Sequence, residues 1–342
     1  MSVKYKPRVS LIGTDSMTGK GIMGVLSQKQ FQIEKAEFFD TDVKKEYSKL
    51  TQFNGEPRVI HPVDDTLLER TDLLFLAGDK KTSRRIGNEA ENKKVFAIDL
   101  SGAFWEHDKV PVIVSGINDD EILRGERHLV ANPHPVTIML SHIIMEAMRD
   151  YGVLKTVAFV LQPASAFGKS GIEELAGQSA DILNKGSCDR KVFQAQIAFN
   201  LLSQSESVDE SGFSIGERRI LSELKRVVKN HEISLSLVQA PVFHGYSVMM
   251  HMKLEKKADI QSLEATYRKS SLFKVYSPSL ECPVSPALTA GQENILIGQV
   301  KQDAVFSNSF WIWAVADNLM VGSALNAYKI ALNMISDEKT PI

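Results

Sequence analysis

The segment VANPHPVTIML, residues 130–140, passes from an extended stretch into an apolar run that is typical of a buried helix. In many α/β enzymes this junction carries a reactive side chain, because the free N–H groups and the positive dipole end of a helix stabilise an anion. Here the junction holds Pro135, which has no functional group. Proline is a preferred residue for the first turn of a helix, since its φ fits and its missing N–H is not needed. The sequence therefore predicts a structural cap at residue 135.

A glycine-rich turn, GTDSMTG at residues 13–19, is the second candidate for chemistry. Gly13 and Gly19 are spaced like the first and last glycines of a dinucleotide-binding turn, in which backbone N–H groups approach a pyrophosphate. Ser16 occupies the middle position, where a side chain hinders this approach. Two interpretations stay open: a nucleotide-binding turn, and a tight strand-to-helix turn without a ligand.

Charged residues and cysteines give weaker signals. Asp40 ends the stretch AEFFD, where a carboxylate would bind a ribose 2′-OH and repel a 2′-phosphate, and a solvated loop acid is the alternative. The run KKTSRR, residues 80–85, either holds an anion or opens a charged helix. Cys188 and Cys282 lie outside any CxxC or Cys/His spacing, so we expect loop thiols, without a disulfide and without a metal site.

Composition limits the classes of partner. Charged residues form 24% of the 342 residues and nearly cancel to a net charge of −2, which disfavours nucleic acid and anionic lipid as partners. The sequence has no apolar run of the ~18 residues that span a membrane. Its first residues also lack the apolar region of a signal peptide. We therefore expect a cytoplasmic protein, and a chain of this length predicts two domains.

The first third of the chain alternates apolar strands with helical segments. Such a pattern indicates an α/β fold with a parallel sheet covered on both faces, as in doubly wound nucleotide-binding domains. The predicted strands are residues 8–13, 36–40, 72–78, 94–102, 110–118 and 128–132, and a buried helix is predicted at 137–152.

From about residue 153 the predicted strands are longer and partly alternate, which favours a separate α+β domain. The predicted strands there are 155–165, 233–243 and 246–255, with helices at 172–184 and 318–336.

Seven segments resemble, in order and spacing, those of aspartate-semialdehyde dehydrogenases. They are the turn at 13–19, DLSGAFWEHDKVPVIVSGIN, VANPHPVTI, QPASAFGKSGIEELAGQ, ERRILSELKRV, LVQAPVFHGYS and VADNLMVGSALNA. The resemblance implies a Rossmann-like NADP-binding domain of residues 1–133 and 318–342, and an α+β substrate and dimerisation domain of residues 134–317. It also implies an enzyme that reduces β-aspartyl phosphate to aspartate semialdehyde through a cysteine thioester, a step of amino-acid biosynthesis.

This sequence departs from the family pattern at the positions that carry the chemistry. Pro135 stands where the family has its nucleophilic cysteine, and Tyr246 stands where it has an acid/base histidine. Gln239 and Trp105 replace two arginines that bind the substrate's anionic groups. Tyrosine, with a reference pKa near 10, is a poor proton shuttle at neutral pH, and glutamine cannot form a charge-assisted clamp. We expect no catalytic residue to remain.

Two histidines near these positions are candidate substitutes. His134 precedes the proline, and its alternative is a turn histidine. His244 lies two residues before Tyr246, so on a strand it would point the same way, and its alternative is a packing histidine.

Other positions keep the residue types of the family. By resemblance, Gln162 orients the thioester, Glu217 and Arg219 help to bind the substrate, and Asn318 lies near the nicotinamide. Packing or hydrogen bonding alone is the alternative for each of them. The residues expected at the cofactor are Gly13, Ser16, Gly19 and Asn318. The expected cofactor is NADP or NAD, with weakened binding because of Ser16.

These observations predict a non-catalytic homologue that acts as a dimeric binding or partner module. A ligand-binding form would use a substrate pocket of Trp105, Pro135, Gln162, Glu217, Arg219, Gln239 and Tyr246. A scaffold form would pair with itself or with an active paralogue. The alternative is a semialdehyde dehydrogenase with NAD(P) and a rebuilt active site.

A homodimer through the second domain is expected from the strands as well. VAFVLQP and SLVQAPVF carry apolar residues on both alternating faces, which requires a cover on each side of the sheet. The domain's own helices supply one cover, and a second subunit is expected to supply the other. The alternative is that the first domain or a long loop supplies it.

Overall fold

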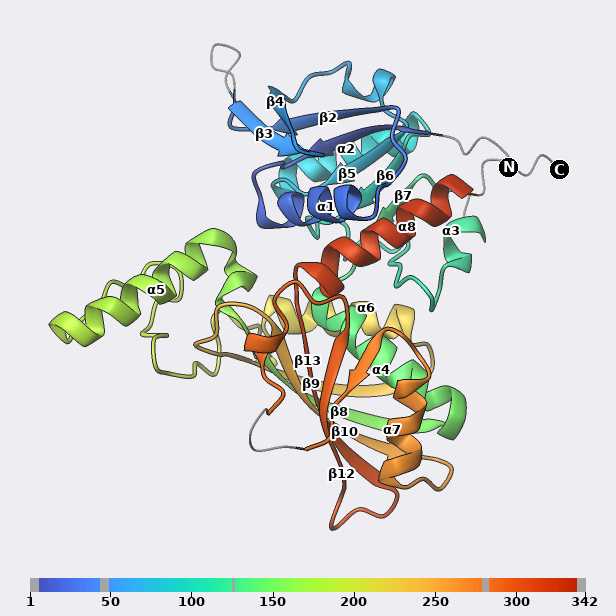
Figure 1. The fold of residues 1–342 in the computed structure, drawn as a ribbon, viewed down its shortest axis with the longest axis vertical. Helices are drawn as coiled ribbons and strands as arrows, with labels where there is room; N and C mark the ends of the chain where they lie inside the picture. The colour runs from blue at the N-terminus through green and yellow to red at the C-terminus, as the bar shows by residue number, and fades with distance from the viewer. Residues whose placement is uncertain (1–5, 44–48, 125–126, 279–282, 337–342) are drawn as a thin grey trace. The chain divides into compact units, whose positions relative to one another are not determined.

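The computed structural model describes residues 6–43, 49–124, 127–278 and 283–336 (Figure 1). The chain forms two compact units. The first consists of Met1–His134 together with Ser323–Ile342, and the second is Pro135–Gly322. The family resemblance implies boundaries after residue 133 and before residue 318.

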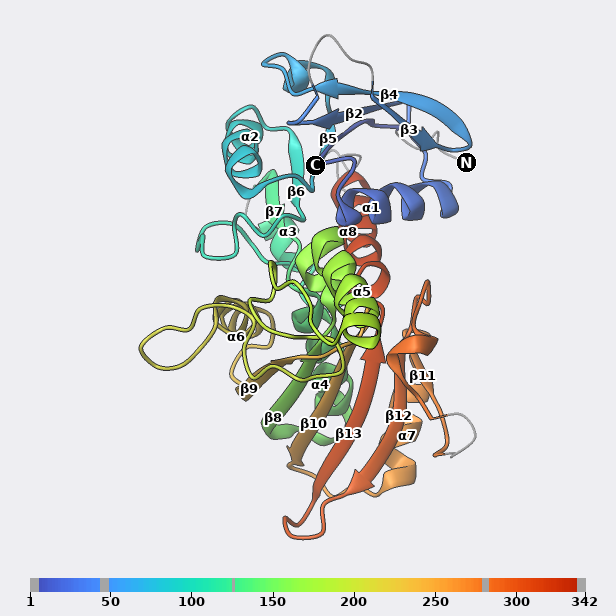
Figure 2. The same cartoon turned by 90° about the vertical axis from the view of Figure 1, so that its left-hand side faces the viewer.

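The first unit contains a sheet with the strand order β3-β4-β2-β1-β5-β6-β7. Neighbouring strands are parallel except β3 and β4, which are antiparallel. The strands are β1 (Arg8–Ile12), β2 (Lys35–Asp40), β3 (Lys49–Phe53), β4 (Glu56–Pro62), β5 (Leu73–Leu76), β6 (Phe96–Asp99) and β7 (Leu129–Ala131). The α-helices are α1 (Met17–Gln28), α2 (Lys80–Asn92), α3 (Asp120–Arg124) and α8 (Leu325–Ser336). Figure 2 shows α2 on one side of this sheet, and α1 with α8 on the other.

Burial explains why these segments form a parallel sheet. All four residues of β5, LLFL, have side chains that are 0% exposed. Such a strand needs a helix layer on each face. The predicted α/β class with a doubly wound nucleotide-binding unit is confirmed.

Two features of the first unit differ from the sequence prediction. Residues 110–118 do not form a strand, because the side chain of Asn118 bonds to the backbone N–H of Val114 (2.9 Å) and the carbonyl of Val112 (2.8 Å). Only an isolated bridge joins Val112 to Ala131. The hairpin of β3 and β4 was not predicted. Its turn is Asn54-Gly55, both with positive φ, a strong hairpin signal in the sequence.

The second unit contains a mixed sheet with the order β11-β12-β13-β10-β8-β9. Its strands are β8 (Val153–Gln162), β9 (Glu232–Gln239), β10 (Tyr246–Leu254), β11 (Phe273–Val275), β12 (Ile295–Gln302) and β13 (Ser309–Ala316). Its α-helices are α4 (Pro135–Tyr151), α5 (Gly168–Lys185), α6 (Ile215–Val227) and α7 (Ile260–Arg268). The strands predicted from 155, 233 and 246 correspond to β8, β9 and β10, and the helix predicted at 172–184 lies within α5. The predicted α+β unit is thus confirmed.

The two faces of this second sheet differ in exposure. Along β8, Ala158 and Val160 are 1% and 0% exposed, whereas Val157 and Phe159 are 50% and 44% exposed. Helices α4 and α6 contact the sheet, and Figure 2 shows α4 and α7 behind its strands. The second unit therefore buries one apolar face beneath its own helices and leaves apolar side chains on the other.

The helix predicted at 318–336 is divided. A π-helical turn, Met320–Ala324, precedes α8, and the boundary between the units falls inside that turn. Among the helices of the described residues, none is long and apolar enough to cross a membrane.

Candidate functional site

Helix α4 begins at Pro135, as a structural cap requires. The ring is half-buried and packs against the backbone of Gly322, where an added Cβ would lie 2.5 Å from the Cβ of Pro135. Thr137, in the same first turn, donates a hydrogen bond to the buried carboxylate of Glu223 (2.6 Å). At the start of α4, the ring of Pro135 is therefore packed against the chain, and the hydroxyl of Thr137 already has a hydrogen-bond partner.

Tyr246 is the first residue of β10, and its side chain is buried. Its hydroxyl donates to Oε1 of Gln162 at 3.1 Å. Burial raises the pKa of Tyr246 far above its ordinary value, because the phenolate would lose its hydration, and the positive charge of Arg219 opposes this rise. Tyr246 is thus a neutral hydrogen-bond donor at physiological pH.

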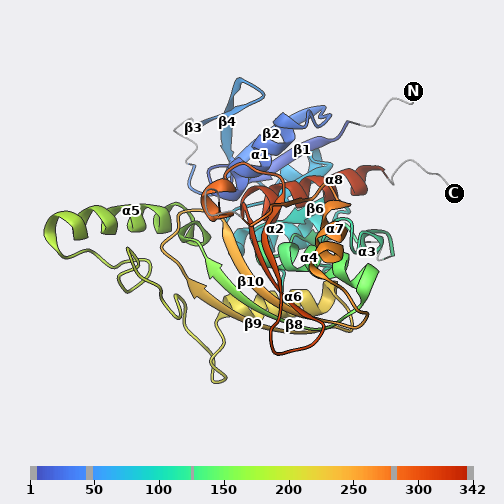
Figure 3. The same cartoon turned by 60° about the horizontal axis from the view of Figure 1, so that its bottom comes forward.

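Gln239 ends β9 and is 0% exposed. Its Nε2 donates to the carbonyls of Gln162 (3.0 Å) and Ala240 (3.2 Å), and its Oε1 accepts from Nε2 of Gln162 (3.1 Å). Gln162 and Gln239 are register partners on the parallel strands β8 and β9, and β8 lies between β9 and β10 (Figure 3). The three adjacent strand ends bring together a neutral network of Gln162, Gln239 and Tyr246.

Gln239→Ala is expected to reduce the free energy of unfolding by about 2–4 kcal/mol, because it removes the three hydrogen bonds of a buried amide and opens a cavity. Urea denaturation at one fixed protein concentration would measure the change. The matched control is Gln261→Ala on the exposed side of α7, which should stay within about 0.5 kcal/mol of the wild type. A change as small as the control's would show that the network contributes little.

The acidic member of the predicted pair on α6 has a structural role. Glu217 accepts from the backbone N–H groups of Ser214 (2.8 Å) and Leu237 (2.9 Å), and it forms a capping box with Ser214 at the start of α6. Its carboxylate joins α6 to β9.

Arg219, the basic member of that pair, contacts a different acid. Its Nε donates to Glu223 at 2.7 Å, and the side chain of Glu223 is 1% exposed. Sequence reasoning missed Glu223, although its position four residues after Arg219 on a helix was a usable signal. The Glu223 carboxylate joins α6 to Thr137 in the first turn of α4.

Asn318 also supports a turn near this network. Its Oδ1 accepts from the backbone N–H of Gly245 (3.1 Å) and from the hydroxyl of Ser165 (3.3 Å). Gly245 has a φ of +86°, so residues 244–246 do not form a continuous strand. The expectation that His244 points the same way as Tyr246 was therefore wrong. His134 precedes α4, as expected for a turn residue.

Trp105 belongs to the first unit, whereas the other predicted pocket residues belong to the second. It lies in the turn after β6 and is half-buried. The Asp99 carboxylate organises this turn by accepting from the backbone N–H groups of Ser101 (2.9 Å) and Phe104 (3.1 Å).

The glycine turn of the first unit is closely packed. A Cβ on Gly13 would lie 2.3 Å from the backbone of Ala77, and one on Gly19 would lie 2.2 Å from the carbonyl oxygen of Gly13. Ser16 caps α1: its hydroxyl accepts from the N–H of Gly19 (2.9 Å) and donates to the carbonyl of Gly13 (2.8 Å). Packing of the turn alone accounts for both glycines.

The remaining predicted positions are the charged run at residues 80–85 and the two cysteines. KKTSRR opens α2, which Asp79 caps by accepting the N–H of Thr82 (2.9 Å), so the charged helix start is confirmed. Cys188 is a free, partly exposed thiol after α5. Cys282 lies outside the described residues.

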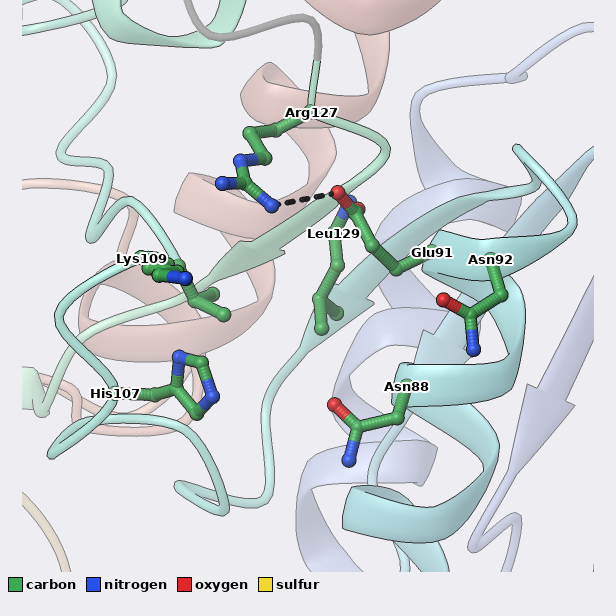
Figure 4. Close-up of a pocket in the computed structure, with 8 residues that line it drawn as sticks. Asn88, Glu91, Asn92, His107, Lys109, Arg127 and Leu129 are labelled. Carbon is green, nitrogen blue, oxygen red and sulfur yellow. Dashed lines mark hydrogen bonds and ion pairs between the residues drawn. The ribbon is translucent and has the colours of Figure 1, made fainter.

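A separate cavity of about 240 Å³ lies in the first unit (Figure 4). Its lining residues are Asn88, Glu91, Asn92, His107, Lys109, Val110, Arg127 and Leu129. Glu91 accepts from Arg127 (3.1 Å) and from the backbone N–H groups of His128 (2.9 Å) and Leu129 (2.7 Å), so its charge is used to hold the start of β7. None of the predicted site residues lines this cavity.

The chain thus combines a doubly wound nucleotide-binding unit with a mixed-sheet unit that has an exposed apolar face. The sequence matches the family profile "Semialdehyde dehydrogenase, NAD binding domain" over residues 8–124. It matches "Semialdehyde dehydrogenase, dimerisation domain" over residues 146–321, more than half of the chain. The chain belongs to the aspartate-semialdehyde dehydrogenase family.

Named relatives match along their whole length. Aspartate-semialdehyde dehydrogenase of Shewanella violacea is 26% identical over 332 residues, which cover 96% of this chain and 98% of the relative. The crystal structure of aspartate semialdehyde dehydrogenase II from Vibrio cholerae has a TM-score of 0.91 at 23% identity, covering 97% of this chain and 99% of its own. The structure from Candida albicans, solved with NADP, has a TM-score of 0.72 at 12% identity and covers 97% of this chain and 99% of its own. The structural likenesses confirm the fold.

Proposed function

We propose that this chain is a non-catalytic member of its family that acts as a dimeric binding or partner module. The observation that carries the proposal is Pro135 at the first position of α4, where the resemblance puts the nucleophilic cysteine. Formation of the family's cysteine thioester requires a thiolate, which a helix N-terminus would favour. Proline supplies no nucleophilic atom there.

The neutral network of Gln162, Gln239 and Tyr246 supports the same proposal. These side chains are buried and bonded to one another, and two of them stand at positions that the family uses for an arginine and a histidine. An acidic substrate needs a cation, and proton transfer near neutral pH needs a group whose pKa lies near 7. Neither requirement is met by these three residues.

The second candidate is an oxidoreductase with NAD(P) and a rebuilt active site. The full-length match to named dehydrogenases favours it. Such an enzyme would need a new nucleophile or base, for which His134 and His244 are candidates. A turnover assay with aspartate semialdehyde separates the two functions, since the non-catalytic form should give no product above background.

For a non-catalytic member, weak cofactor binding and a cytoplasmic location are part of the proposal. Ser16 supports weaker binding, because its hydroxyl bonds to Gly13 and Gly19 of the turn that would approach a pyrophosphate. A ligand-binding module and a scaffold differ in a thermal-shift screen with NAD, NADP and small acids. A ligand that binds only the folded state raises the melting temperature, whereas a pure scaffold shows no shift.

The proposed dimer uses the exposed face of the second sheet. Phe159, Met249 and Trp313 are cross-strand neighbours on β8, β10 and β13, so they form one apolar row. Phe159 is 44% exposed, and the other two are half-buried. The match to a dimerisation domain over residues 146–321 supports a second copy as the cover of this row.

A further inference from the structure

Three carboxylates stand where the glycine turn meets the end of β2. Asp40, the last residue of β2, is 9% exposed, and its Oδ2 accepts the backbone N–H of Asp15 at 2.9 Å. Asp42 follows two residues later. Burial raises the pKa of Asp40, and the negative charges of Asp42 and Asp15 raise it further. The carboxylates of this group therefore repel one another.

Among the described residues, two lysines near these acids, Lys20 and Lys49, are already paired. Lys49, at the start of β3, forms ion pairs with Asp15 and with Asp42, the latter at 3.1 Å. Lys20 lies 3.7 Å from Asp15. The hydrogen bond from Lys49 lowers the pKa of Asp15, and the bonds to both acids raise the pKa of Lys49. Two of the three carboxylates, Asp15 and Asp42, thus pair with these two lysines, and an anion that used either lysine would compete with a carboxylate.

Three backbone N–H groups of the glycine turn already donate hydrogen bonds within the protein. The N–H of Asp15 bonds to Asp40, the N–H of Ser16 bonds to the carbonyl of Gly13 (3.1 Å), and the N–H of Gly19 bonds to Ser16. In a dinucleotide-binding turn, such N–H groups approach the phosphates. This competition affects the pyrophosphate of NAD and of NADP alike. NADP fits less well than NAD because its 2′-phosphate adds further negative charge beside the carboxylates at the end of β2.

We propose that Asp15, Asp40 and Asp42 make the first unit discriminate against NADP, so that any nicotinamide nucleotide bound there has an unphosphorylated ribose, as NAD does. A carboxylate at the end of the second strand accepts a ribose 2′-OH and repels a 2′-phosphate. The inference concerns the first unit alone and holds whether or not the second unit is catalytic.

Isothermal titration calorimetry of the full chain, which measures the affinities for NAD and for NADP, tests this inference. Asp42→Arg removes one carboxylate and adds a guanidinium, at a side chain that is 70% exposed and therefore tolerant of change. We expect NADP affinity to rise at least about tenfold, because a new charge-assisted contact becomes available, while NAD affinity changes less than about threefold. The matched control is Asp65→Arg, an equal charge change at an exposed residue of the same unit.

Each possible result of the calorimetry either supports or overturns the inference. Wild-type protein that binds NADP as tightly as NAD overturns the inference. Failure of Asp42→Arg to improve NADP binding also overturns it, as does an equal gain in Asp65→Arg, which would reflect only the net charge. If the wild type binds neither nucleotide, a gain of NADP binding in Asp42→Arg alone supports the inference, and its absence refutes it.

Discussion

Pro135→Cys is expected to leave the rate of semialdehyde oxidation at least about a thousandfold below that of an active relative. The new thiol would stand at the start of α4, where the helix dipole favours a thiolate. General acid/base catalysis contributes about 10²–10⁴ in rate, and Tyr246 cannot supply it because burial raises its pKa and Gln162 holds its proton. Substrate orientation is lost in addition, since Gln239 is a buried neutral amide.

The measurement is the absorbance of the reduced nicotinamide, with aspartate semialdehyde, phosphate and either cofactor. The control is a thiol titration with a chromogenic disulfide beside the wild type, which has its own Cys188 and Cys282, because a reactive thiol in excess of the wild type's shows that the new cysteine is present and reactive. A variant with reactive thiol and activity within tenfold of a relative would contradict the claim that Gln239 and Tyr246 block the chemistry.

Phe159→Glu is expected to convert a homodimer into a monomer. Phe159 stands beside Met249 on the exposed face of the second sheet, and Met249 is in turn paired with Trp313. An obligate interface there would bury upwards of ~2,000 Å² and would enclose the new carboxylate without a cation. Leaving a charge buried and unpaired in this way costs about 3–5 kcal/mol per site, and the two-fold axis doubles the number of sites.

Light scattering at about micromolar concentration would follow the mass, with sedimentation to obtain the dissociation constant. Leu50→Glu is the matched control, because Leu50 is 63% exposed on β3 of the first unit. The control should stay dimeric. A monomeric wild type, or a Phe159→Glu protein as dimeric as the control, would rule out this face as the interface.

Most of the fold could be predicted from the sequence, because buried segments have characteristic patterns of apolar residues. The apolar run of β5 and the partial alternation of β8 predict the two kinds of sheet, and both are present. Residues 110–118 were misassigned because only the short stretch around Val112 bonds to β7, at Ala131, and Asn118 then holds the following residues in a turn. The hairpin at Asn54-Gly55 was missed although its signal was local.

The site was less predictable, because its contacts are long-range. Register brings Gln162 beside Gln239, 77 residues later, and residue types alone do not show that the two amides bond to each other. Glu223 was overlooked although its contact with Arg219, four residues earlier on α6, is local; only its contact with Thr137 depends on how α4 packs on α6. His244 was misjudged because the positive φ of Gly245 interrupts the strand.

One measurement tests the central claim most directly: turnover of aspartate semialdehyde by the wild-type protein, purified from a host that lacks its own enzyme. The Shewanella violacea relative should be assayed beside it, with phosphate and with NADP or NAD. We expect a rate at least about 10⁴-fold below that of the relative with either cofactor, since loss of a nucleophile and its proton-transfer partner has effects of this size. Turnover within about a hundredfold of the relative would contradict the claim and establish a rebuilt active site.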